Sequence, residues 1–93
     1  MPKLFEIEPV FVDTVSGPLE LGKLYVSKKY QTVLHLCACG ECNELTVTPL
    51  HDPKTGWQYT ENDGKVTLHP SIGNFQMPCR SHYWIRENKV VWC

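Results

Sequence analysis

Three of the five cysteines of this 93-residue chain fall within six positions, at Cys37, Cys39 and Cys42. A second pair of metal-binding residue types, Cys79 and His82, stands far downstream with the spacing Cys-x-x-His. Thiolate sulfur and imidazole nitrogen are the ligands that tetrahedral zinc prefers, and a short turn lets two closely spaced ligands hold one ion. The sequence therefore predicts a structural zinc site that joins two distant segments of the chain.

The candidate ligands outnumber the four that a closed tetrahedral site needs. Spacing favours Cys39 and Cys42, because a Cys-x-x-Cys turn that contains Gly40 lets both sulfurs point at one centre. Cys37 ends the incoming strand and can replace one of them. A redox role is disfavoured, because the βαβ pattern of thioredoxin-like proteins is missing. The prediction is a zinc site with four ligands drawn from Cys37, Cys39, Cys42, Cys79 and His82.

Length and charge restrict the class of protein. A chain of 93 residues fits one domain and buries a smaller fraction of its surface than a longer chain, so a metal staple would stabilise it. The net charge of −1 gives no basic excess for binding nucleic acid or an acidic membrane, although Lys28, Lys29, Arg80 and Arg86 leave a local basic patch open. We therefore predict a single domain over residues 1–93 that binds neither nucleic acid nor membrane.

The first residues carry charge and lack a long apolar stretch, so we expect neither a signal peptide nor a transmembrane helix. A cytoplasmic location follows as the default expectation. In a reducing compartment clustered cysteines bind metal more often than they form disulfides, and an odd number of cysteines fits a disulfide framework poorly.

Short segments rich in β-branched and aromatic residues alternate with turn residues, and none shows a sustained helical period. We predict a mainly β domain, a small sheet of short antiparallel strands and hairpins stapled by the zinc site. Strands are expected at residues 4–12, 23–27, 31–37, 44–50, 57–60, 65–69, 81–86 and 90–92. The first is expected at a sheet edge and interrupted at Pro9, the cysteine turn should connect a hairpin, and residues 70–74 should break the pattern.

The other polar candidates do not form a recognisable catalytic set. His35 lies in the middle of an expected strand and is interpreted as structural. His69, Ser71 and Ser81 are possible reactive residues, or residues that hydrogen-bond to metal ligands, and a scaffold role is favoured for His69. The sequence therefore predicts no catalytic residues.

Several segments together carry a family resemblance: residues 22–27, residues 35–40 followed by 47–50, residues 68–74 and residues 78–85. They resemble the DUF6527 family of small bacterial and phage-encoded proteins, over about Gly22 to Trp92. The resemblance implies a zinc-binding domain. Some members are encoded beside genes for a ubiquitin-like protein, E1-like and E2-like enzymes and a JAB-type peptidase. In the usual pattern of that family the third cysteine directly follows Cys-x-Cys-Gly, whereas here Glu41 stands between Gly40 and Cys42. This difference leaves open whether Cys37 or Cys42 completes the site.

Two functions of different classes follow. The first is a non-catalytic zinc-binding accessory or adaptor protein in a bacterial ubiquitin-like conjugation and antiviral defence system, with E1-like, E2-like or ubiquitin-like proteins as partners. The lack of a catalytic set favours it. The alternative is a small zinc-dependent hydrolase, or a subunit that completes an enzyme's site, acting on ubiquitin-like conjugates with His69, Ser71 or Ser81 near a zinc ion that keeps an open coordination position.

Overall fold

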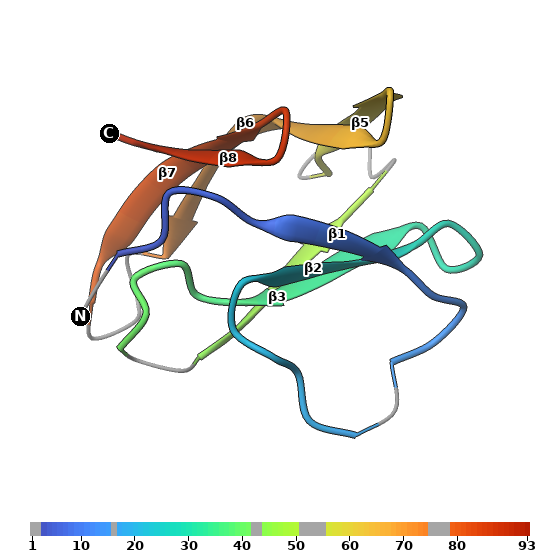
Figure 1. Ribbon diagram of the computed structural model, residues 1–93, viewed down its shortest axis with the longest axis horizontal. Coiled ribbons are helices and arrows are strands. Elements are labelled where there is room, and N and C mark those ends of the chain that lie inside the picture. The colour runs from blue at the N-terminus through green and yellow to red at the C-terminus, as the bar shows by residue number, and fades with distance from the viewer. Residues whose placement is uncertain (1–2, 16, 42–43, 51–55, 75–78) are drawn as a thin grey trace.

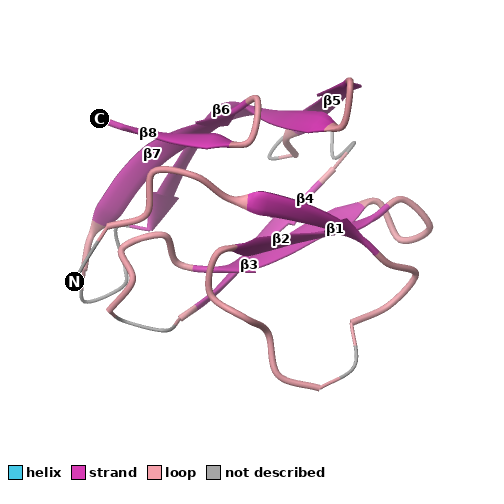
Figure 2. Ribbon diagram, in the orientation of Figure 1, coloured by secondary structure: helices cyan, strands magenta, loops and turns pink. Residues whose placement is uncertain are grey.

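The computed structural model describes residues 3–15, 17–41, 44–50, 56–74 and 79–93. Its strands are β1 (Glu8–Phe11), β2 (Lys23–Ser27), β3 (Thr32–Leu36), β4 (Leu45–Pro49), β5 (Gln58–Asn62), β6 (Lys65–Asn74), β7 (Ser81–Arg86) and β8 (Lys89–Trp92). No helix occurs in these ranges (Figure 2). The prediction of a mainly β fold is therefore confirmed. Within the same ranges no helix is long and apolar enough to cross a membrane.

The strands form two four-stranded sheets, with the orders β1-β2-β3-β4 and β5-β6-β7-β8. Neighbouring strands are antiparallel except for β1 and β2, which are parallel. The two sheets face each other, with β6, β7 and β8 above β1, β2 and β3 in Figure 1. Each sheet is built from one contiguous half of the chain, so most strand pairing is local in sequence.

The core lies between the two sheets. Alternate side chains of a strand point to opposite faces of its sheet, and the inward ones are buried here. The first sheet contributes Leu24, Val26 and Val33, and the second contributes Val66, Leu68, Ile72, Tyr83 and Ile85. The alternation is complete along β7, where the second, fourth and sixth residues, His82, Trp84 and Arg86, face away from the core. The outward face of the second sheet therefore displays His82, Trp84 and Arg86 of β7.

The segment before β1 joins the two halves. Leu4 N–H donates to the Ala38 carbonyl (2.8 Å), and Ile7 N–H donates to the Asn88 carbonyl (2.9 Å). The indole Nε1–H of Trp92 donates to the Leu4 carbonyl at 2.8 Å. These bonds bring the cysteine turn after β3 close to the β8 edge of the second sheet.

β1 lies at the edge of its sheet, as the sequence predicts, but it continues through Pro9 instead of stopping there. Proline lacks a backbone N–H and is tolerated at an edge, where one side of the strand has no neighbour in its sheet. The expected interruption at Pro9 is therefore wrong.

β6 also continues where a break was expected, from residue 70 to residue 74. Leu68 pairs with Ile85 and Ile72 pairs with Tyr83, so four steps along β6 match two steps along β7. Residues 69–71 consequently stand opposite Trp84 alone. A bulge of this kind leaves some backbone groups outside the ladder, which makes room for Pro70 within a strand.

Candidate active site and thiol cluster

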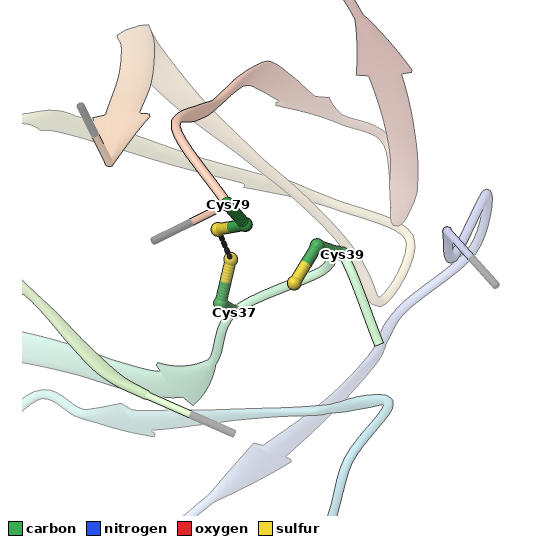
Figure 3. A group of neighbouring side chains, drawn as sticks. All are labelled: Cys37, Cys39 and Cys79. Atoms are coloured by element: carbon green, nitrogen blue, oxygen red, sulfur yellow. Dashed lines mark hydrogen bonds between the residues drawn. The ribbon is translucent and has the colours of Figure 1, made fainter. Parts of the chain in front are cut away.

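The Sγ atoms of Cys37, Cys39 and Cys79 all lie within 4.8 Å of one another (Figure 3). Those of Cys37 and Cys79 are 3.5 Å apart. Tetrahedral zinc with Zn–S bonds of ~2.3 Å places its sulfur ligands roughly 3.8 Å from each other. The three thiols therefore fit three corners of a metal site, which joins the end of β3 in one sheet to the segment that leads into β7 in the other.

The turn after β3 supports two of these thiols. Gly40 N–H donates to the Cys37 carbonyl at 3.3 Å, and Gly40 adopts a φ of 78°, a conformation that glycine takes without steric cost. Glu41 N–H then points at the Cys39 sulfur, 3.4 Å away. Backbone N–H groups directed at sulfur stabilise its thiolate form, which is the form that binds metal.

On the other side of the cluster, the Ser81 hydroxyl donates to the Cys79 sulfur at 3.1 Å. Arg80 stands between them with a φ of 48°, which is uncommon for a residue other than glycine. This local conformation lets the side chains of Cys79 and Ser81 meet. Ser81 is buried beside the thiols, so its hydroxyl acts on the cluster rather than on the outward face.

Two of the predicted ligands are not among these thiols. Cys42 lies outside the described residues. His82 points to the opposite face of β7 from Ser81, and its Nε2 atom forms a hydrogen bond with the hydroxyl of Ser71. The roles of Cys42 and His82 as metal ligands stay predictions.

A serine and a histidine meet on the outward face of the second sheet. The Ser71 Oγ and His82 Nε2 atoms are 2.7 Å apart, and both side chains are half-buried. A hydroxyl within hydrogen-bond reach of a neutral imidazole is the arrangement that activates a serine nucleophile, because the ring nitrogen can accept the hydroxyl proton. The pair can therefore carry out nucleophilic chemistry on a carbonyl group.

The register of the two strands explains how the pair forms. Beyond the bulge Gly73 pairs with His82, which places Ser71 diagonally across from the histidine on the same face. A long side chain can reach such a diagonal neighbour. Gly73 is exposed and has no side chain, so β6 places no side chain directly opposite His82.

Aromatic and cationic groups continue along the same face. The ring centroids of His69 and Trp84 are 5.4 Å apart, and the Arg86 guanidinium carbon lies 4.5 Å from the centroid of the Trp84 ring. His69 is exposed and Trp84 is half-buried. The stack begins two residues from His82, so Trp84 lies on the same face as the Ser71–His82 pair and next to it.

On the inner side of β7, a buried hydrogen bond connects the strand to the cysteine turn. His35 Nε2 and Tyr83 Oη are 2.7 Å apart, and the Ala38 N–H donates to the same oxygen at 3.4 Å. Burial lowers the pKa of His35 to about 4, so its imidazole is neutral near pH 7. His35 is thus a structural residue beside the thiols, because its ring is fully buried.

Sequence reasoning named both Ser71 and His82 but did not join them. The Cys-x-x-His spacing assigned His82 to the metal, and the proline removed residues 70–74 from the expected strand. Alternation along residues 81–86 already separates His82 from Ser81 and Tyr83. The partner of His82 depends on the two-residue register shift in β6, which no residue pattern signals.

One family model matches the chain, over residues 11–93, and its description is bacterial ubiquitination-like system serine protease (BubE). It agrees with the DUF6527 resemblance on a bacterial ubiquitin-like system, under a different family name. Neither a curated protein sequence nor a solved structure gives a significant match.

Proposed function

The chain belongs to the family of bacterial ubiquitination-like system serine proteases (BubE), and on this premise we propose that it is a serine protease with Ser71 as nucleophile and His82 as general base. The observation that carries the proposal is the 2.7 Å separation of Ser71 Oγ and His82 Nε2. This function departs from the adaptor role that the sequence alone favours, which rests on the lack of a catalytic set.

In the proposed reaction, Ser71 Oγ attacks the scissile carbonyl carbon while its proton moves to His82 Nε2. The carbon–nitrogen bond then breaks, the leaving amine takes this proton from His82, and the substrate's acyl group stays on Ser71 as an ester. Water attacks the ester, gives one proton to His82, and the carbon–Oγ bond breaks. Ser71 regains its proton from His82, so the net change is hydrolysis of one peptide or isopeptide bond.

The thiol cluster has a separate, structural role in this proposal. Zinc held by Cys37, Cys39 and Cys79, with a fourth ligand such as Cys42, would supply a cross-link between the two sheets. The cluster reaches β7 through Cys79 and Ser81, on the inner side of the strand, whereas His82 and Ser71 lie on the outer side. The thiols therefore stabilise the strand that carries the base without contacting the substrate.

We assign the substrate to the proteins of the same system, as a ubiquitin-like protein or a conjugate made from it. Other proteins of the system, such as E1-like and E2-like enzymes, make conjugates whose bonds are amides of the kind that an activated serine hydrolyses. The family description supports a proteolytic role within such a system. The open position over Gly73 allows an extended polypeptide to approach the pair.

A fluorophosphonate probe tests the nucleophile directly, because it reacts with serine hydroxyls that a neighbouring base activates. We expect the probe to label the wild-type chain at Ser71, as located by mass spectrometry of the digested protein. Labelling should be lost in Ser71→Ala and reduced at least about 100-fold in His82→Ala, which matches the usual contribution of a general base. Ser27→Ala is a matched control, since Ser27 lies in the other sheet and its hydroxyl donates a hydrogen bond to the Asp13 carbonyl.

The same variants discriminate between the alternatives. Hydrolysis of a ubiquitin-like fusion protein that persists in Ser71→Ala and stops on metal removal would favour a zinc-dependent hydrolase. A folded, zinc-loaded chain that neither reacts with the probe nor cleaves the fusion would refute the serine protease and favour the adaptor role.

A further inference from the structure

The outward face of the second sheet continues well beyond the Ser71–His82 pair. Along β7 the next two outward residues are Trp84 and Arg86. Since a strand rises about 3.4 Å per residue, Arg86 lies roughly 14 Å along the strand from His82. An extended polypeptide has the same rise and places alternate side chains on one side. On β7, Arg86 lies four residues beyond His82 and two beyond Trp84, the residue that stands opposite Ser71. A substrate lying along β7 with its scissile carbonyl between Ser71 and His82 would therefore put a residue two to four positions from its scissile bond against Arg86.

A hollow of about 430 Å³ lies at this far end of the face. It is lined by Thr60, Asn62, Lys65, Thr67, Arg86 and Glu87, from β5, β6 and the end of β7. Lys65 and Arg86 are exposed, and neither forms an ion pair with any residue that the structure describes. Glu87 is the single carboxylate among the lining residues, so the lining has a cationic excess in a chain whose net charge is −1.

We propose that this hollow is a substrate subsite for a carboxylate side chain, aspartate or glutamate, two to four residues from the scissile bond. The proposal rests on the assignment of Ser71 as the nucleophile, because that atom fixes where the scissile carbonyl must lie. Trp84 forms the floor between the pair and the hollow and contacts the substrate residues between the cleaved bond and the carboxylate.

The chemistry of the two cations supports a carboxylate ligand. The Arg86 guanidinium is held against the Trp84 ring, 4.5 Å from its centroid, which restricts its position while its N–H groups remain able to donate. Lys65 adds a flexible ammonium group from β6. A carboxylate accepts hydrogen bonds from both groups, and charged donors and acceptors form the stronger bonds of this kind.

The test is cleavage of a proteome-derived peptide library, with the cleaved bonds identified by mass spectrometry for the full chain and its variants. We expect aspartate and glutamate to be enriched at one position, two to four residues from the cleaved bond and on one side of it. For a matched peptide pair with Glu or Gln at that position, Lys65→Gln and Arg86→Gln should each lower the Glu-to-Gln ratio of kcat/KM about two- to five-fold, as expected for partly exposed ion pairs. The double reversal Lys65→Glu with Arg86→Glu should replace the acidic preference by a basic one.

The control is Lys29→Gln, which makes the same change of charge in the turn after β2, on the other sheet, and should leave the Glu-to-Gln ratio unchanged. Cleavage rates are divided by the rate of fluorophosphonate labelling of each variant, which separates substrate recognition from damage to the pair. Labelling of Ser71 without an acidic preference, or without cleavage of the peptides, would overturn the subsite and leave the serine protease standing. Loss of both labelling and Ser71-dependent cleavage in the wild-type chain would overturn the two proposals together.

Discussion

The buried oxygen of Tyr83 is a sensitive point of the fold. Tyr83 is 0% exposed, and its Oη atom lies 2.7 Å from His35 Nε2 and 3.4 Å from Ala38 N. Tyr83→Phe removes this one atom. The ring remains, with its packing against Trp92 at a centroid distance of 5.0 Å, so the variant creates almost no cavity. The change isolates the polar contribution of a single hydroxyl.

The expected loss of stability follows from the two polar groups that lose the Tyr83 oxygen as a partner, the His35 imidazole and the Ala38 N–H. A buried polar group that loses its partner costs about 1–3 kcal/mol. His35 should account for most of the lost stability, because its hydrogen bond to Tyr83 is short and its Nδ1 atom already has no hydrogen-bond partner among the described residues. The longer bond from Ala38 adds a smaller amount. We expect Tyr83→Phe to lower the free energy of unfolding by about 2–3 kcal/mol, or the melting temperature by roughly 10–20 °C for a domain of this size.

Urea unfolding followed by tryptophan fluorescence, with zinc at the same saturating concentration throughout, measures this change. The double variant His35→Leu with Tyr83→Phe provides the check, because replacing both polar partners by apolar groups removes the orphaned nitrogen. We expect the double variant to be more stable than the sum of the two single effects predicts. A loss below about 0.5 kcal/mol in Tyr83→Phe, or strictly additive effects, would refute the reasoning.

Three further results are expected. Burial lowers the pKa of His35 to about 4, so between that value and about 6.5 the unfolded chain binds a proton that the folded chain does not. Stability should therefore fall by up to about 3 kcal/mol as the pH decreases from 6.5 to 4, and the difference between wild type and His35→Leu in pH-dependent urea unfolding should show this slope. Restoring zinc to chelator-treated protein at about 100 times its dissociation constant should add about 2.7 kcal/mol, or roughly 10–20 °C in a thermal scan, and Cys37→Ser should remove most of this gain. Gly73→Val should slow fluorophosphonate labelling of Ser71, because the new side chain stands opposite His82. The melting temperature should stay level or rise, since glycine is unfavourable inside a strand. Unchanged labelling would show that residue 73 does not control access of the probe to Ser71.

The sequence predicted the local parts of the fold well. Residues 23–27 and 81–86 are strands with the predicted limits. Asp63 and Gly64, a residue pair typical of hairpin turns, connect β5 to β6 with φ of 54° and 76°. These features depend on side-chain alternation and on residues that tolerate positive φ, and both are readable from a few neighbouring residues.

Features that depend on pairing between segments were harder to predict. The division into two sheets, the parallel pairing of β1 with β2 and the shift in β6 are set by packing between distant residues. The cluster of Cys37, Cys39 and Cys79 could be predicted from the sequence, because closely spaced cysteines have few common roles and metal binding is the main one. The Ser71–His82 pair was not, because serine and histidine have many roles and only the register makes them neighbours.

The division of the chain into two contiguous halves has a practical consequence. The connection between β4 and β5 separates a fragment with Cys37 and Cys39 from a fragment with Cys79 and the Ser71–His82 pair. Cutting there would leave every strand pair of both sheets within its own fragment. Reassembly of the two pieces would then depend on the inner faces, on the shared thiols and on the hydrogen bonds that the segment before β1 makes to the second sheet. A metal ion that binds all three thiols would favour the reassembled pair. The position of the thiols across the two halves therefore makes the association of such fragments sensitive to any metal ion that the cluster binds.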